Sequence, residues 1–200
     1  MPDAKGWHSR GYLPHFDSPG TVQHVVFRTR DSLPSVVMDA FPGEIAARRR
    51  AAGAFLDRLE HGNVLADPEV AAIAQAALLH FDGTRYNLLA WCVMPNHVHV
   101  AVRQNEGWPL GGLVKSWKMF AAVKINIATG NRGPVWVPDY FDRFIRNHDH
   151  LAATIDYVES NPVRSGLAAT PQDWFFSSAS RKPERGRPGA LLRIGTARSE

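Results

Sequence analysis

The strongest constraint on the fold is the run "RYNLLAWCVMPNHVHVAVRQ", residues 85–104. Two stretches rich in apolar and β-branched residues flank Pro95 and Asn96. Residues of the first kind favour strands, whereas proline and asparagine favour turns. The run therefore predicts a β-hairpin. Since an isolated hairpin is at best marginally stable in water, the rest of the chain must supply elements that cover it.

The second strand of this hairpin has two different faces, because successive side chains of a strand point to opposite sides. One face is apolar and consists of Val98, Val100 and Val102. The opposite face carries His97 and His99. Helices can cover the valine face, so we expect the histidine face to be free of helices and available as a site.

Two adjacent imidazoles on an open face suit a divalent metal ion. The alternative is a pair of partly exposed surface histidines, and the spacing alone leaves both interpretations open. A second such pair, His148 and His150, opens a predicted helix. Residues two apart on a helix point roughly 200° away from each other. We therefore expect that second pair to be solvated and not to share a metal.

Further elements follow from hydrophobic periodicity and from the glycines and prolines that punctuate it. We expect strands at residues 21–34 and 135–146, and helices at residues 43–62, 68–81, 109–130 and 148–160. Asn161 and Pro162 should end the last helix, because a proline disfavours helical backbone at the preceding residue.

These elements predict one domain with loose ends. Residues 1–20 should be an irregular lead-in, residues 21–176 the folded domain, and residues 177–200 a polar, basic and flexible tail. With 200 residues, of which 44% are hydrophobic and 21% charged, the chain can bury a sizeable core.

The composition also bounds the function. A net charge of +4 permits a nucleic-acid partner without requiring one. The single cysteine, Cys92, excludes an intramolecular disulfide and a cysteine-based zinc site. No apolar run has the length of a membrane span or a signal peptide, and the first ten residues are polar. We therefore expect a soluble cytosolic protein.

The last predicted helix carries a second group of candidate site residues. Leu151, Ile155 and Val158 form one stripe and should face the core. Tyr157 lies roughly 120° from that stripe, on the same side as Asn161 one turn later. Taken singly, Tyr157 also fits an amphipathic tyrosine at a core boundary, and Asn161 also fits a helix C-cap.

Taken together, the motifs "PNHVHV", "YFDRFIRN" and "YVESNPVRSGL", in this order, resemble the REP-associated tyrosine transposases. That family is a branch of the single-tyrosine HUH transposases, in which HUH denotes histidine, hydrophobe, histidine. The resemblance runs from about residue 11 to residue 177. It implies a ferredoxin-like α+β HUH domain, with an antiparallel sheet whose central strands carry the histidine pair and with helices packed on one face.

The resemblance also implies a chemistry, in which a tyrosine attacks single-stranded DNA, forms a 5′-phosphotyrosine link and releases a 3′-hydroxyl. By position, Tyr157 matches the nucleophile, His97 and His99 match metal ligands, and Asn161 matches a third ligand. A phenol has a pKa near 10 and needs help at neutral pH, which Mg²⁺ or Mn²⁺ would supply. Because Pro162 disfavours helical backbone at Asn161, the sequence leaves open whether Asn161 lies one helical turn from Tyr157.

The substrate implied by the resemblance is a chromosomal palindromic repeat folded as a hairpin, and the protein would act as a monomer or a homodimer in the cytoplasm, associated with the nucleoid. Two alternatives remain open: a DNA-binding protein that has lost turnover, and a metal-dependent phosphodiesterase that uses water. Of the other tyrosines, Tyr140 is the rival nucleophile, and we assign it to packing.

Basic residues could line a track for DNA phosphates. The alternative for each is ordinary solvated charge. The candidates are Arg103, Lys115, Lys118, Lys124, Arg143, Arg146 and Arg164.

Overall fold

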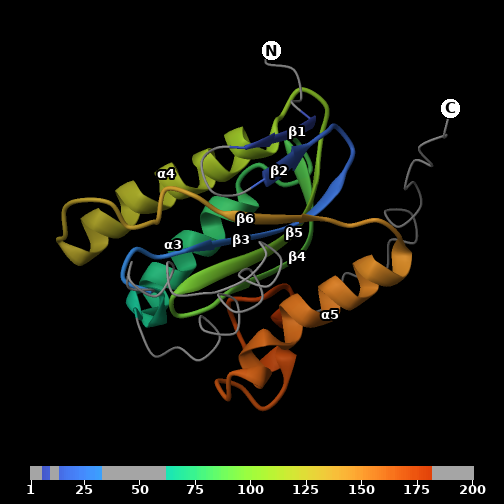
Figure 1. The fold of residues 1–200 in the computed structure, drawn as a ribbon. Coiled ribbons are helices and arrows are strands. Elements are labelled where there is room, and N and C mark those ends of the chain that lie inside the picture. Colours follow the sequence, from blue (N-terminus) through green and yellow to red (C-terminus); the bar gives the residue numbers. More distant parts are fainter. Residues whose placement is uncertain (1–5, 10–13, 33–61, 182–200) are drawn as a thin grey trace, which may run out of the picture.

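The computed structural model describes residues 6–9, 14–32 and 62–181 (Figure 1). Its main sheet has four strands in the order β4-β5-β3-β6, and every neighbouring pair is antiparallel. The strands of this sheet are β3 (Val22–Arg28), β4 (Tyr86–Val93), β5 (His97–Gln104) and β6 (Phe141–Phe144). The helices are α3 (Pro68–Leu79), α4 (Leu110–Thr129) and α5 (His148–Arg164), with short 3-10 turns η1 (Val64–Ala66), η2 (Pro171–Asp173) and η3 (Ser178–Ser180).

The order of elements along the chain, β3-α3-β4-β5-α4-β6, places β3 and β5 at the centre of the sheet. This β-α-β-β-α-β arrangement is the ferredoxin-like one. The predicted α+β class, the antiparallel sheet and the central position of the histidine strand are therefore confirmed. The predicted hairpin is β4 and β5, which turn at Pro95 and Asn96.

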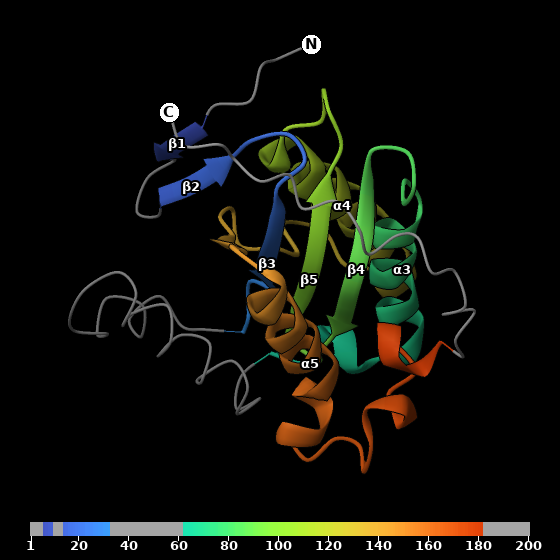
Figure 2. The same cartoon turned by 90° about the vertical axis from the view of Figure 1, so that its right-hand side faces the viewer.

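The valine face of the sheet holds the larger core, under α3 and α4 (Figure 2). Val98, Val100 and Val102 have no exposed surface. Burial of each valine contributes about 1.5–3 kcal/mol to folding. Trp117 of α4 donates a hydrogen bond from its indole N–H to the hydroxyl of Tyr86 at 2.8 Å. The polar atoms of these two large side chains are thus paired inside the core, as buried polar groups require.

The expectation that helices pack on only one face is wrong, because α5 covers the histidine face (Figures 1 and 2). A second, smaller core explains this packing. Val158 of α5 is fully buried against Ala90 and Cys92 of β4 and Ala101 of β5. The histidine face is therefore polar on one part and apolar on another, and the apolar part buries the stripe of α5.

Two predicted helix ends are confirmed and one is wrong. Asp67 caps α3 by accepting a 2.8 Å hydrogen bond from the Glu69 N–H, and α4 ends at Gly130 with φ of 67°. In contrast, α5 continues through Pro162 to Arg164. The missing N–H of a proline removes only one bond of the final turn, so the helix tolerates it there.

Two strand and helix predictions differ from the structure in extent. The strand expected at 135–146 is confined to β6, with an isolated bridge between Thr29 and Trp136 before it. The helix expected at 43–62 lies outside the described residues, apart from its last residue. Within the described ranges, no helix is both long and apolar enough to span a bilayer.

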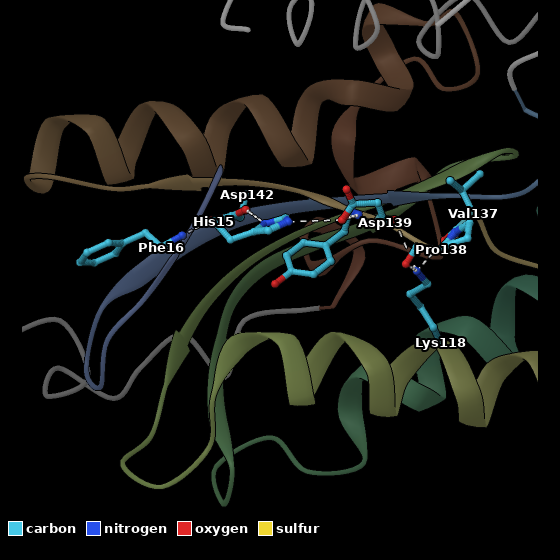
Figure 3. A network of polar contacts seen from close by, with 8 residues as sticks. His15, Phe16, Lys118, Val137, Pro138, Asp139 and Asp142 are labelled. Carbon is cyan, nitrogen blue, oxygen red and sulfur yellow. Dashed lines mark hydrogen bonds and ion pairs between the residues drawn. The ribbon is translucent and has the colours of Figure 1, made fainter. Parts of the chain in front are cut away.

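The predicted lead-in at residues 1–20 is not irregular where the structure describes it. Strands β1 (Gly6–Ser9) and β2 (Pro14–Asp17) form an antiparallel hairpin. His15 fastens this hairpin to the segment around β6 (Figure 3). Its Nδ1 lies 2.5 Å from Asp142 Oδ1, and its Nε2 lies 3.3 Å from Asp139 Oδ1. The Phe16 N–H donates to the other carboxylate oxygen of Asp142 at 3.1 Å.

The start of the predicted tail at residues 177–200 is also part of the fold. Ser177 bridges to Cys92 at the free edge of β4. The buried Ser178 hydroxyl accepts a hydrogen bond from the Trp91 N–H at 3.1 Å and donates to Glu159 Oε1 at 2.7 Å. These contacts cover the edge of β4, so the boundary at residue 177 is wrong. Residues 182–200 lie outside the described chain.

The His15 contacts predict a pH-dependent stability. Burial lowers the pKa of His15, but the hydrogen bonds and charges of Asp139 and Asp142 outweigh burial and raise it to about 9. Because folding raises this pKa, protonated His15 stabilises the fold below pH 6.5. That contribution is lost as the pH rises through about 9. We expect His15→Gln to lower the free energy of unfolding by up to about 3 kcal/mol at pH 6, and by less at pH 9.

Urea unfolding of both proteins between pH 6 and pH 9.5 measures this difference. His148→Gln, at the exposed start of α5, is the matched control and should follow the wild type. A His15→Gln difference that stays constant across this pH range would contradict the charged contact.

Candidate functional site

The pairing of β5 with β3 builds the candidate site. In an antiparallel pair, residues directly opposite each other point to the same face of the sheet. His97 of β5 pairs with Arg28 of β3, and Ala101 pairs with His24. Since His99 lies between His97 and Ala101 on this face, the strand pairing brings a third histidine and a buried arginine to the histidine pair.

The two predicted metal ligands converge through their Nε2 atoms, which lie 2.8 Å apart. His97 has no exposed surface and His99 is 2% exposed. Burial, together with the neighbouring His24, lowers the pKa of His97 to about 3. Burial and the other two imidazoles hold the pKa of His99 well below 6.5. Both rings are therefore neutral at pH 7, which is the form that binds a metal ion.

Helix α5 brings the other two predicted residues to the same place. The Asn161 Nδ2 atom lies 3.2 Å from His99 Nε2, and Asn161 is fully buried. The Tyr157 ring is partly buried, with its centroid 5.5 Å from that of His99 and 5.8 Å from that of His24. Because α5 stays helical through Pro162, Asn161 does lie one turn from Tyr157.

The residues present fit a divalent cation. Two ligands about 2.1 Å from one ion and at right angles to each other lie about 3 Å apart, which is close to the separation of the two Nε2 atoms. The Asn161 Oδ1 atom is buried and has no hydrogen-bond partner within the described residues, so an amide oxygen is available as a third ligand. Within the described ranges, no group of three or more His, Cys, Asp or Glu side chains is arranged to hold a metal ion.

His24 is a site residue that sequence reasoning missed. Its Nε2 atom lies 3.1 Å from His99 Nδ1, and the two rings are stacked with an interplanar angle of 17°. Burial, with the nearby positive charge of Arg143, lowers its pKa to about 4. The sequence offered one indication that His24 has a role, since it is a polar residue inside the otherwise largely apolar strand "TVQHVVFR". Only the pairing of β3 with β5 shows that His24 faces the histidine pair.

Arg28 was missed for the same reason. Its side chain is only 8% exposed, and burial lowers its pKa. One guanidinium nitrogen donates to the Ser32 hydroxyl at 3.3 Å. A buried guanidinium opposite His97 adds positive charge to this face of the sheet.

Two of the predicted basic residues, Arg164 and Arg143, also lie near the site. The Arg164 guanidinium carbon lies 5.1 Å from the centre of the Tyr157 ring. Arg143 of β6 pairs with His24 in the sheet, and Arg103 lies on the histidine face of β5. Arg146 follows β6 at an exposed position. These four arginines remain candidates for phosphate contacts.

The three predicted lysines are not brought to this face, because α4 carries them and packs on the valine face. Lys118 instead donates to the backbone carbonyls of Val137 and Pro138, at 2.6 and 2.8 Å (Figure 3). Burial lowers the pKa of Lys118 to about 8, although Asp139 opposes this shift. Lys115 and Lys124 are exposed on α4.

Tyr140 belongs to the core, as predicted. It is 6% exposed and packs in the larger hydrophobic cluster, and its ring centroid lies 4.6 Å from that of His15. Tyr157 is therefore the tyrosine that the described structure places beside the histidine pair.

This arrangement defines a class of protein: a ferredoxin-like sheet with a His-x-His pair on a central strand, crossed by a helix that presents tyrosine and asparagine one turn apart. No family model matches the chain. A curated relative, the REP-associated tyrosine transposase of Escherichia coli (strain K12), is 29% identical over 101 residues, which are 50% of this chain and 59% of that protein.

A solved structure of a REP-associated tyrosine transposase bound to a REP hairpin has the same fold. The TM-score is 0.59 at 17% sequence identity, over 89% of this chain and 87% of that one. The chain is thus similar to the REP-associated tyrosine transposases, and the predicted resemblance is confirmed. The sequence match spans about three-fifths of the curated relative's length.

The packing of α5 generates a prediction about Cys92, which has no exposed surface and lies beneath this helix. Burial raises the pKa of its thiol well above the ordinary value, so the native protein should react slowly with Ellman's reagent at pH 8. Val158→Ala removes buried contacts and should destabilise this packing by about 2 kcal/mol. We expect at least about a tenfold faster reaction of the thiol, measured by absorbance.

Ala152→Ser, on the exposed side of the same helix, is the control and should leave the rate near that of the wild type. Equal rates for Val158→Ala and the wild type would show that the thiol is reached without loosening α5.

Proposed function

We propose that this protein is a metal-dependent endonuclease and strand transferase for single-stranded DNA, with Tyr157 as its nucleophile. The observation that carries the proposal is the convergence of Tyr157, two neutral buried imidazoles and an amide on one face of the sheet. The relative's name and the similar structure's bound REP hairpin support a hairpin-forming palindromic repeat as the substrate.

In this proposal, the phenol oxygen of Tyr157 attacks the scissile phosphorus while the bond to the 3′ oxygen breaks. The phenol loses its proton, a 5′-phosphotyrosine link forms, and the departing 3′ oxygen takes up a proton. Rejoining is the reverse reaction. The T-shaped contacts of the Tyr157 ring with His24 and His99 hold the phenol in place, and the Arg164 guanidinium favours negative charge developing on it.

His97, His99 and Asn161 would hold the ion, Mg²⁺ or Mn²⁺. When bound, the ion neutralises the non-bridging phosphate oxygens and stabilises the developing negative charge. The nitrogen-rich ligand set suits Mn²⁺ at least as well as Mg²⁺, which prefers oxygen. Burial keeps both imidazoles neutral, so no proton competes with the ion at neutral pH.

The nucleophile is tested by covalent trapping. We expect the wild type to form a protein–DNA adduct with single-stranded hairpin oligonucleotides from the repeats flanking the gene, in Mn²⁺, on denaturing gels. Tyr157→Phe should form none, because it lacks the attacking oxygen. Tyr140→Phe is the matched control and should still form the adduct.

Other outcomes identify the alternatives. Binding by the wild type without any adduct would favour a DNA-binding protein that has lost turnover. Cleavage that survives Tyr157→Phe would favour a phosphodiesterase that uses water, and Tyr157 would then not be the nucleophile.

Metal removal gives an independent test. Treatment with EDTA should abolish the adduct, and added Mn²⁺ should restore it. A metal ion at 100 times its Kd should stabilise the wild type by about 2.7 kcal/mol, seen as a higher Tm. His97→Ala and His99→Ala should lose this stabilisation, whereas His148→Ala should keep it. Adduct formation that persists in EDTA would contradict a metal-dependent mechanism.

A further inference from the structure

We propose that Asn96 and His24 are positioning residues that set the tautomers of His97 and His99, so that both imidazoles present an unprotonated Nε2 to the cation. This inference rests on the proposed function, because it requires the metal site formed by these two histidines. It assigns roles to two residues beyond the predicted site.

The contact of Asn96 determines the proton position on His97. The Asn96 Oδ1 atom lies 2.6 Å from His97 Nδ1, and a carbonyl oxygen can only accept a hydrogen bond. His97 therefore carries its proton on Nδ1, and in the neutral ring this leaves Nε2 as a lone pair.

The surroundings hold Asn96 in this position. Asn96 is only 1% exposed, in the turn between β4 and β5. Its backbone carbonyl accepts two hydrogen bonds from Thr29, one from the N–H at 2.9 Å and one from the hydroxyl at 3.0 Å. The turn is thereby tied to the end of β3, so the amide side chain meets His97 from an anchored backbone.

His24 contacts the corresponding ring nitrogen of His99. Its Nε2 atom lies 3.1 Å from His99 Nδ1, whereas the Nε2 atom of His99 faces His97. His24 thus contacts the nitrogen on the other side of the ring and is not a third ligand at the Nε2 atoms. When the His99 Nδ1–H donates a hydrogen bond to His24 Nε2, the neutral His99 ring leaves its Nε2 atom unprotonated, with a free lone pair.

The two contacts have one consequence. With both protons held on the Nδ1 atoms, two lone pairs lie 2.8 Å apart, an arrangement that favours a cation between them. Without these partners, either ring could carry its proton on Nε2 and donate it to the other, and the ion would have to break that hydrogen bond. Hydrogen-bond partners of this kind typically contribute 10–100-fold to metal affinity.

The test compares paired variants by titration of the DNA-free protein with Mn²⁺, with free Mn²⁺ measured by electron paramagnetic resonance. Asn96→Leu and His24→Phe remove the acceptor, and each should weaken Mn²⁺ binding about 10–100-fold. Asn96→Asp and His24→Gln each retain a hydrogen-bond acceptor and should bind Mn²⁺ no more weakly than the wild type. His148→Phe is the control and should leave the affinity unchanged.

A second measurement needs no metal ion. It tests the proposal on the wild type, so it remains decisive even when a variant does not fold. The ¹⁵N shifts of the imidazoles in the metal-free wild type report the tautomer of each ring. We expect His97 to carry its proton on Nδ1, and Asn96→Leu to shift it toward Nε2. A wild-type His97 protonated on Nε2 would overturn the proposal.

The outcomes separate this inference from the proposed function. If His97→Ala abolishes Mn²⁺ binding while Asn96→Leu and His24→Phe retain it, the metal site stands and the positioning roles are wrong. If the wild type does not bind Mn²⁺, or binds it as well as His97→Ala does, the metal site is wrong and the positioning roles fall with it.

Discussion

The pairing of β3 with β5 is the constraint on which the rest of the site depends. Seven register pairs, from Val22 with Arg103 to Arg28 with His97, align the two central strands along their length. A slip of one residue would turn every side chain of one strand to the other face. The apolar core on the valine face opposes such a slip, because it would expose three fully buried valines. The stability of one face therefore fixes the geometry of the other.

The covering of the histidine face gives the site its chemistry. If α5 did not pack there, the imidazoles would be solvated and would titrate near their ordinary pKa. Burial under this helix keeps His97 and His99 neutral. The same helix carries Tyr157 and Asn161, so the element that buries the pair also delivers the candidate nucleophile and third ligand. Packing and chemistry are thus consequences of a single contact between α5 and the sheet.

Local signals in the sequence were sufficient for much of this molecule. The cap at Asp67, the glycine at the end of α4 and the turn at Pro95 act over a few residues, so each could be predicted without the fold. Alternation along one strand placed His97 and His99 on a common face, and helical periodicity placed Tyr157 off the core stripe. The resemblance to a family then combined the histidine pair, Tyr157 and Asn161 into one candidate site, although each of these observations was weak alone.

What the sequence could not determine were the contacts between segments distant along the chain. The role of His24 depends on which strand pairs with β5, and the role of His15 depends on carboxylates 124 and 127 residues away, Asp139 and Asp142. Likewise, the contacts of Lys118 with backbone carbonyls could not be predicted, because they depend on the packing of α4 on the valine face. The sequence by itself determined the local elements and the residue types available for chemistry, because short-range backbone preferences act within a few residues. Only the tertiary structure decided which of these side chains meet, because strand register and helix placement are set by burial summed over the whole domain.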